Sequence, residues 1–359
     1  MGAWVDLTRL APHELRDLVD SIGETPMVRL DVQTGAGRRR PLFLKLEGEN
    51  PGGSVKDRTA RALVADLERR GALSRESVIV ESTSGNLGVA LALVALAKGY
   101  RFHAVVDPKV SRASVEKVLA LGASVEVADE ADDTGGYLLA RLRRVHELCE
   151  RWHEAVWTNQ YENRANPLAH YTSTGPEILR QMDGVVDAVV VPVSTGGTLA
   201  GISRYLREER PETEVVAVDS RGSVALGGIA GPRLLTGIGA ARRSRFLLDR
   251  RLYDRVVLVD DPRAISFCRF VADRTGLRLG GSSGAVLAAA AELVAEAGPE
   301  RVVCLCPDYG DRYVQTLYDD EWLEAHGIER SDELVAPIED VALSEPLPAP
   351  RVPASALVS

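Results

Sequence analysis

A lysine at the start of a predicted helix is the residue with the clearest chemical potential. Lys56 lies in the stretch Asn50–Arg58, where Ser54 is a suitable N-cap and Asp57, three residues later, approximates a capping box. Apolar residues at helical spacing follow, and Gly71 ends the pattern. In a first helical turn, free backbone N–H groups and the positive end of the helix dipole disfavour an ammonium group. Such a lysine can form a Schiff base with an aldehyde cofactor, although Lys56 taken alone is more simply interpreted as a solvated surface residue.

Two loops rich in glycine and hydroxyl groups follow predicted strands, at the edge where parallel α/β folds bind ligands. In the loop Ser82–Gly88, backbone N–H groups and the hydroxyls of Thr83 and Ser84 suit a carboxylate, and the Asn86 amide suits a phenolate or carbonyl oxygen. Helix capping explains the hydroxyl residues of this loop equally well. The second loop, Ser194-Thr195-Gly196-Gly197-Thr198, combines close backbone approach with amide and hydroxyl donors, which suit a phosphate.

A third loop, Gly280–Ala285, opens another apolar helix. The Ser282 hydroxyl in this loop could bond a weakly basic ring nitrogen, although a tight turn with an N-cap also explains it. The dinucleotide and Walker patterns are absent from the strand ends, and Gly237-Ile238-Gly239 lacks the third glycine of the former. A Schiff-base lysine, a carboxylate cradle, a phosphate cradle and a ring-nitrogen partner together predict a pyridoxal phosphate (PLP) site.

The elements that position these loops alternate between strand and helix from about residue 77. The pattern predicts α/β architecture with parallel sheets covered on both faces, in two units that meet near Gln160. The segment Leu87–Leu96 is apolar nearly all round, so its helix should be buried. The predicted strands are Ser77–Glu81, Arg101–Asp107, Ser124–Ala128, Ala155–Thr158, Asp187–Val193, Glu214–Asp219, Arg255–Asp260 and Arg301–Cys306. Helices are predicted at Leu87–Lys98, Ala113–Leu121 and Gly136–Arg151.

Composition narrows the class of protein. The 359 residues are 45% hydrophobic, enough for a sizeable core, and the net charge of −9 argues against a general nucleic-acid-binding protein. Apolar runs of membrane-spanning length and a signal-peptide pattern are absent, so we expect a cytoplasmic protein without membrane contact. The four cysteines are expected to be free thiols, and no metal site is predicted.

From Ile22-Gly23-Glu24-Thr25-Pro26 to about Tyr318, the chain resembles the fold type II PLP enzymes of the cysteine synthase and cystathionine β-synthase group, which have the tryptophan synthase β-like fold with two three-layer αβα domains. The resemblance implies a homodimer. It also implies a larger cofactor-binding domain of residues 1–49 and 161–328 and a smaller mobile domain of residues 50–160. Residues 329–359 carry five prolines, several acidic residues and little periodicity, which predicts a flexible Pro-rich tail or an arm that lies on a neighbour.

The resemblance also assigns roles to the site residues. Lys56 is the implied catalytic residue that carries the internal aldimine, Asn86 bonds the cofactor's 3′ oxygen, and Ser282 faces the pyridine nitrogen. The implied phosphate ligands are Ser194, Thr195, Gly196, Gly197 and Thr198. The implied substrate contacts are Thr83, Ser84 and Gln160 on the α-carboxylate, together with Asn86 and Gly237.

Several departures from ordinary sulfhydrylases resemble a subgroup that makes precursors of 2,3-diaminopropionate for siderophores and peptide antibiotics. They include Leu87 after Ser-Gly-Asn, Ser194 at the head of the phosphate loop, and Tyr161 where phenylalanine is common. Three further distinctive segments are Gly135–Arg141, Val218–Ser223 and Pro307–Tyr313. The subgroup joins O-phospho-L-serine to the amine of L-glutamate through an α-aminoacrylate, giving N-(2-amino-2-carboxyethyl)-L-glutamate and phosphate, and a partner dehydrogenase then releases diaminopropionate.

These small amino-acid substrates carry several negative charges and need extra anchoring groups. Arg141, Tyr161 and Ser194 are the candidates, although Arg141 could equally lie on the surface of its helix beside Arg143 and Arg144. The main alternative function is a cysteine synthase that uses O-acetylserine or O-phosphoserine with sulfide. A serine dehydratase and a catalytically silent protein on the same fold remain further alternatives.

Overall fold

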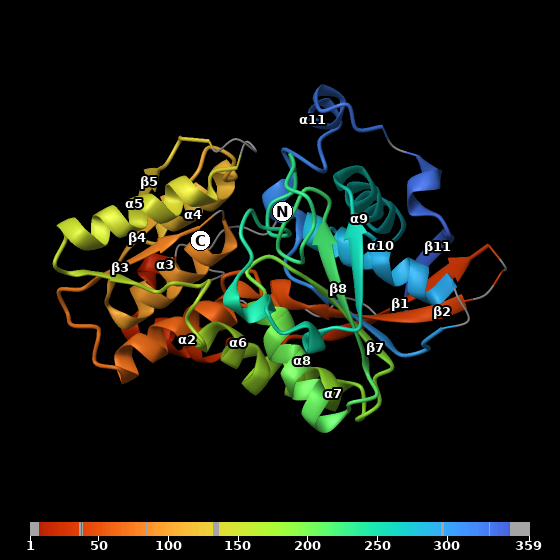
Figure 1. Ribbon diagram of the computed structural model, residues 1–359, viewed down its shortest axis with the longest axis horizontal. Coiled ribbons are helices and arrows are strands. Elements are labelled where there is room, and N and C mark those ends of the chain that lie inside the picture. The colour runs from red at the N-terminus through yellow and green to blue at the C-terminus, as the bar shows by residue number, and fades with distance from the viewer. Residues whose placement is uncertain are drawn as a thin grey trace.

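The computed structural model describes residues 7–344, except 36, 38, 84, 132–135, 296, 297 and 330. Ser84, Gly135 and the tail from residue 345 therefore lie outside the described residues. Two sheets organise the molecule, a smaller one on the left of Figure 1 and a larger one on the right. Among the described residues, no helix combines the length and the apolar character that a membrane span requires.

The smaller sheet has four parallel strands in the order β5-β4-β3-β6. The strands are β3 (Val78–Ser82), β4 (Arg101–Val106), β5 (Ser124–Val127) and β6 (Ala155–Trp157). The helices α2 (Lys56–Arg69), α3 (Asn86–Lys98) and α4 (Arg112–Ala120) pack on one face, and α5 (Leu138–Arg151) packs on the other. Helix α3 is buried along nearly its whole length, as its all-apolar sequence predicts.

The larger sheet has seven strands in the order β11-β1-β2-β10-β7-β8-β9. Strands β10, β7, β8 and β9 run parallel to β2, whereas β1 pairs antiparallel with both β2 and β11. The strands are β1 (Met27–Thr34), β2 (Arg39–Leu46), β7 (Ala188–Pro192), β8 (Glu214–Ser220), β9 (Arg255–Val259), β10 (Val302–Cys306) and β11 (Ile338–Leu343).

Helices cover both faces of the larger sheet, which completes a three-layer αβα arrangement. One face packs against α9 (Asp261–Thr275) and α10 (Gly281–Ala295), and the other against α7 (Gly175–Gln181) and α8 (Gly197–Glu209). Within the part of the chain that the structure describes, the other helices are α1 (Pro12–Asp20), α6 (Ala165–Ala169), α11 (Asp320–Ala325) and the π-helical turn His170–Thr174. Short 3-10 helices lie at Leu7–Arg9, Glu47–Glu49, Arg245–Leu247, Arg250–Leu252, Gly310–Tyr313 and Asp332–Val335.

The C-terminal segment differs from the flexible tail predicted for residues 329–359. Residues 338–343 form β11, which pairs with β1 at the edge of the larger sheet. Val335, Ile338 and Val341 are buried in the same core cluster as β1 and β2. The prolines and acidic residues of this region masked the sequence pattern of a short strand with one apolar face. The prediction of a flexible tail was therefore wrong for residues 338–343.

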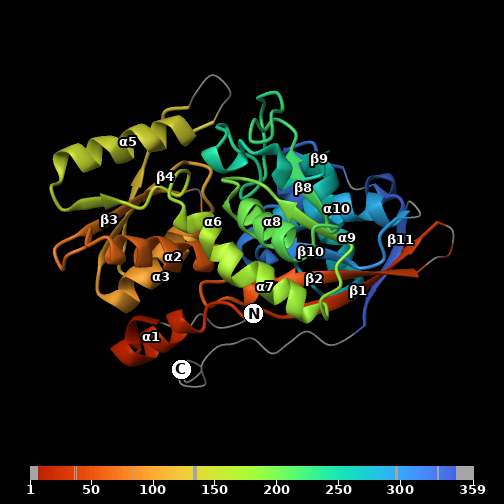
Figure 2. The ribbon, with the colours of Figure 1, turned by 60° about the horizontal axis from the view of Figure 1, so that its bottom comes forward.

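The N-terminal helix α1 also lies apart from its predicted place. Its buried residues Leu15, Leu18 and Val19 join the core of the smaller sheet through α3, although residues 1–49 were predicted to belong to the larger domain. Figure 2 shows α1 below the smaller unit. The amphipathic face of α1 would fit either unit, so the sequence could not decide where it packs. The remaining domain boundaries and the mobility of the smaller unit stay predictions.

Candidate active site

Helix α2 begins at Lys56, as predicted, but its capping differs. Val55 is the N-cap and makes no side-chain capping bond, while the Ser54 hydroxyl accepts a 3.2 Å hydrogen bond from the Lys56 N–H. Asp57 reaches back to the Gly52 N–H instead of forming a capping box. Burial lowers the pKa of the Lys56 ammonium, although the negative charges of Asp308 and Glu47 oppose this effect. The position therefore favours a neutral amine.

A cavity lined by loops from both sheets brings the predicted site together. Lys56 lines it alongside every predicted residue of the three loops except Gly197 and Ser84, the latter lying outside the described residues. The sequence-predicted residues in its lining are Lys56, Thr83, Asn86, Arg141, Gln160, Tyr161, Ser194, Thr195, Gly196, Thr198, Gly237 and Ser282. Residues that lie more than 200 positions apart in the sequence thus line the same cavity.

The loop after β7 presents the N-terminus of α8 to this cavity. Gly196 adopts the left-handed conformation with φ of +82° and provides no side-chain cap, so the first N–H groups of α8 remain available to a ligand. A Cβ at Gly196 would lie 2.4 Å from Leu247, and one at Gly197 would lie 2.1 Å from the Asn166 amide oxygen. Close packing therefore requires both glycines, and the resulting anion cradle suits a phosphate.

A buried histidine connects this loop to helix α2. His170 Nε2 lies 3.3 Å from the Thr198 hydroxyl and 3.2 Å from the Thr59 hydroxyl, and Nδ1 lies 3.0 Å from Thr174. Burial lowers the pKa of His170 to about 3, so the ring is neutral near pH 7. His170 therefore fixes the phosphate loop relative to the lysine helix without adding a charge.

Asn86 begins α3 and is held by residues from the opposite end of the chain. Its Nδ2 donates a 2.7 Å hydrogen bond to Asp308, and its Oδ1 accepts one from the Arg312 guanidinium. The Tyr313 hydroxyl donates to the same Asp308 carboxylate at 2.6 Å. Among the described residues Asn86 Nδ2 has no second acceptor, which leaves its other amide hydrogen for a ligand in the cavity.

Sequence reasoning singled out the segment Pro307–Tyr313 but assigned it no role. Asp308 and Arg312 are buried, and Tyr313 and Pro307 line the cavity. Its position in the sequence could have identified it as part of the site, because the segment follows a predicted strand at the edge where the other site loops lie. Ser111, Ser114 and Thr236 also line the cavity and were not predicted.

Two predicted carboxylate ligands have side chains that are already engaged. The Thr83 hydroxyl accepts a 2.9 Å bond from the Gly88 N–H, so it caps α3 as the simpler interpretation proposed. The Gln160 side chain donates a 2.8 Å bond to the Ser82 carbonyl. The N–H groups of Thr83 and Gly85 are engaged as well, with the Val105 carbonyl and the Thr83 hydroxyl, and the α-carboxylate contacts remain a prediction.

The three candidate anchors meet at one wall of the cavity. Arg141, on α5, is buried and forms a 3.0 Å ion pair with Asp107, so it is not a surface residue. Tyr161 is also buried, which raises the pKa of its hydroxyl, whereas neighbouring Arg141 lowers it. Ser194 donates a 3.1 Å hydrogen bond to the Gly239 carbonyl.

Comparisons with known proteins agree with this site. Residues 18–308 match the family model described as pyridoxal-phosphate dependent enzyme. The chain belongs to this family. It is similar to the N-(2-amino-2-carboxyethyl)-L-glutamate synthase of Ralstonia nicotianae, with 46% identity over 309 residues, which is 86% of this chain and 91% of the relative.

Solved structures of similar enzymes show the same fold. An O-ureido-L-serine synthase matches with a TM-score of 0.75 and 36% identity, covering 86% of this chain and 98% of that chain. An O-acetylserine dependent cystathionine β-synthase from Helicobacter pylori matches with a TM-score of 0.74 and 32% identity, covering 83% of this chain and 97% of that chain. The fold class is therefore that of the cysteine synthase and cystathionine β-synthase enzymes.

The residues of this PLP-dependent enzyme fit the cofactor. Lys56 supplies an amine with a lowered pKa, the α8 N-terminus supplies N–H groups that its N-cap Gly196 does not cap, beside two sterically required glycines, and Ser282 supplies a hydroxyl at the start of α10. These donors match an aldehyde, a phosphate and a ring nitrogen. Which residue bonds which cofactor atom remains a prediction.

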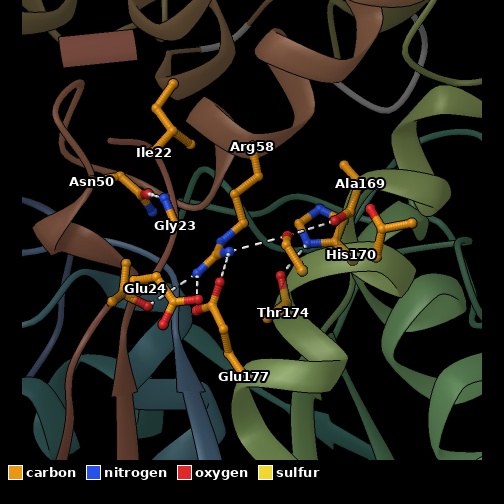
Figure 3. Close-up of polar contacts among 12 residues, drawn as sticks. Ile22, Gly23, Glu24, Asn50, Arg58, Ala169, His170, Thr174 and Glu177 are labelled. Atoms are coloured by element: carbon orange, nitrogen blue, oxygen red, sulfur yellow. Dashed lines mark hydrogen bonds and ion pairs between the residues drawn. The ribbon is translucent and has the colours of Figure 1, made fainter. Parts of the chain in front are cut away.

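A buried ion network lies beneath the lysine helix of this PLP-dependent enzyme. Arg58, two residues after Lys56, contacts Glu47 at 2.7 Å and Glu177 at 2.6 Å, and Lys45 contacts Glu177 at 2.8 Å. Figure 3 shows the guanidinium of Arg58 facing the Glu177 carboxylate. Two positive and two negative side chains are balanced here, so the start of α2 is fixed to the larger sheet without net buried charge.

Proposed function

We propose that this enzyme joins O-phospho-L-serine to the amine of L-glutamate, giving N-(2-amino-2-carboxyethyl)-L-glutamate and inorganic phosphate. In this β-replacement the Cβ–O bond of phosphoserine breaks, a Cβ–N bond to glutamate forms, and the α-proton that is removed first is later returned. The observation that carries the proposal is the 46% identity to a synthase of that name across most of both chains. The grouping of Arg141, Tyr161 and Ser194 at one wall supports it.

The side chains around the cavity have distinct tasks in this reaction. PLP, when bound, withdraws electrons from the α-carbon of the amino acid attached to it. Lys56 Nζ, where burial lowers the pKa and so favours the neutral amine, takes up the α-proton and later returns it. The N–H groups at the start of α3 orient the substrate carboxylate. Arg141 and Tyr161 stabilise the departing phosphate or the approaching carboxylates.

Incubation of the holoenzyme with O-phosphoserine and L-glutamate tests the proposal. Mass spectrometry should detect N-(2-amino-2-carboxyethyl)-L-glutamate, with one phosphate released per adduct. A parallel reaction with sulfide in place of glutamate tests the cysteine synthase alternative. Cysteine formation from O-phosphoserine or O-acetylserine, without any glutamate adduct, would contradict the proposal.

We further propose the setting in which this reaction takes place. The product suits a downstream dehydrogenase that releases 2,3-diaminopropionate for siderophore or antibiotic synthesis. A cytoplasmic homodimer, with a smaller domain of residues 50–160 that closes over the larger one, completes the proposal. Its support is the family relationship and the division of the cavity wall between the two sheets.

A further inference from the structure

A second cavity adjoins the active site and shares one wall with it. Arg141, Tyr161, Ser194, Thr236 and Gly237 line both cavities. The second cavity extends away from Lys56 toward the loop that precedes Thr236 and Gly237. Arg233 lies in this loop and lines the second cavity but not the active-site cavity. A molecule whose amine reaches the active site across the shared wall would place its far end near Arg233.

The Arg233 guanidinium is fixed in position but incompletely paired. Its Nη1 donates a 3.1 Å hydrogen bond to the Ile238 carbonyl. A Cβ at Gly239, which has φ of +75°, would lie 2.3 Å from the same nitrogen, so the guanidinium packs directly against the backbone. Nε is buried and has no hydrogen-bond partner among the described residues, and within the same residues Arg233 forms no ion pair.

Arg233 differs from the neighbouring arginines in its ion pairing. Arg141 is paired with Asp107 at 3.0 Å, and Arg242 is paired with Glu162 at 2.5 Å. The charge of Arg233 lowers the pKa of the buried carboxyls of Asp219 and Asp261, but among the described residues Arg233 forms no ion pair with either. Among the described residues, Arg233 therefore has no carboxylate at ion-pair distance, whereas Arg141 and Arg242 each have one.

We propose that the second cavity is the subsite for the amino-acid nucleophile, and that Arg233 binds its side-chain carboxylate. The inference rests on the proposed function, since it names the residue that selects a dicarboxylic amino acid. A carboxylate on the Nε–Nη2 side of the guanidinium would supply the acceptor that Nε lacks, in the geometry that arginine offers to carboxylates. Sulfide would need no such contact.

Two variants of Arg233 test this subsite in the holoenzyme. Arg233→Met should raise the KM for L-glutamate roughly 10- to 100-fold, because one charged hydrogen-bonded contact is lost. The KM for O-phosphoserine should not change. Arg233→Lys should recover part of the loss through its charge, without the paired geometry. L-glutamine, whose side chain is neutral, should be a poor nucleophile for the wild type and should lose little further in Arg233→Met.

Arg242→Met is the matched control. Arg242 lies 5.8 Å from the Tyr161 ring centroid but lines neither cavity, so its removal should leave the preference for glutamate unchanged. A rise in the KM for O-phosphoserine in Arg233→Met, with glutamate unaffected, would assign Arg233 to the leaving phosphate and overturn the inference.

Binding of glutarate separates the subsite from the proposed function. Glutarate carries two carboxylates without an amine, and its binding to the holoenzyme by titration calorimetry requires no turnover. We expect binding to the wild type that weakens roughly 10- to 100-fold in Arg233→Met. Equal binding to both proteins, or none to the wild type, would overturn the subsite. Failure of the wild type to form the glutamate adduct would overturn only the proposed function.

Discussion

Lys56 must lose a proton before its nitrogen can attack an aldehyde, and its surroundings favour that loss. Burial lowers the pKa of its ammonium group, and the nearest negative charges, Asp308 and Glu47, reverse only part of this effect. We expect Lys56→Ala to abolish the visible Schiff-base absorption and to reduce turnover by at least roughly 10²–10⁴-fold, the usual contribution of a general base. Absorption spectra and initial rates with O-phosphoserine measure both effects.

Borohydride reduction followed by peptide mapping identifies the reactive amine directly. The wild-type holoenzyme should carry the reduced cofactor on Lys56. The matched control is Lys98→Ala, which removes a partly exposed lysine paired with Glu68 and should leave spectrum and rate unchanged. Label on another lysine would contradict the assignment of Lys56.

At the residue level, the sequence predicted groups with local signatures and missed those that act through distant contacts. Lys56 and Gly196 lie beside helix starts and glycine turns, which short motifs reveal. Arg312 and Asp308 hold Asn86 across 222 or more positions, and this contact depends on how two sheets meet. The pairing of Arg141 with Asp107 likewise required the structure, because the sequence alone left a surface position equally plausible.

Helix α2 depends on a buried network whose charges balance. Burial disfavours the ionised form of Glu177, but Arg58 and Lys45 outweigh this effect and lower the pKa of its carboxyl to about 2. Glu177→Gln should reduce the free energy of unfolding by roughly 3–5 kcal/mol at neutral pH, because two buried cations lose a counter-charge. Denaturant unfolding of both proteins at several pH values measures the difference.

The pH dependence of this difference has a defined sign. The folded-state pKa lies below the unfolded value of 4.5, so the stabilisation is complete above pH 4.5 and is lost as the pH falls toward 2. The gap between wild type and Glu177→Gln should shrink over that range. Glu24→Gln is the control, since its carboxylate is 67% exposed and pairs with exposed Arg180, which predicts a cost below about 1 kcal/mol. A gap that does not change with pH would contradict the argument.

Strand β11 contributes to stability at the edge of the larger sheet. A chain that ends at residue 330 would lose the strand and the buried side chains of Val335, Ile338 and Val341. Each such side chain contributes roughly 1.5–3 kcal/mol when buried, so the melting temperature should fall markedly. A chain that ends at Ser344 keeps β11 and is the matched control. Equal melting temperatures for both truncated chains would show that β11 does not stabilise the fold.

Elements in the βα alternation were predictable because buried parallel strands are short, continuous apolar runs between helices. The strand predicted at Ser124–Ala128 is β5, and the helix predicted at Leu87–Lys98 is α3, each within a residue of the structure. The strands β1, β2 and β11 pair antiparallel at one edge, and each mixes buried with partly or fully exposed positions. This weaker pattern, before and after the alternating region, does not identify them from the sequence alone.

Considered as a whole, the molecule places its active site where two separately built sheets meet. The Arg58 network links α2 to the larger sheet on one side of the cavity, and the Asn86–Asp308 bond links α3 to the segment after β10 on the other. Lys117 of α4 and Asp311 form a further 3.2 Å ion pair between the same two units. These contacts, together with the His170 contacts to Thr198 and Thr59, hold the lysine and the phosphate loop in their relative positions.

Asp308 is the hydrogen-bond acceptor that joins the two units at the cavity, so its replacement should weaken the contact between them. Burial raises the pKa of its carboxyl, while hydrogen bonds from Tyr313 and Asn86 oppose this rise. Asp308→Ala removes both bonds, each worth roughly 1.5–3 kcal/mol if the carboxylate is charged. We expect weaker PLP binding in equilibrium dialysis and faster amide hydrogen exchange over residues 85–90. Tyr313→Phe removes one bond and keeps the Asn86–Asp308 contact, so its effects should be smaller. If Tyr313→Phe matched Asp308→Ala in both measurements, the contact between the units would not be what holds Asn86.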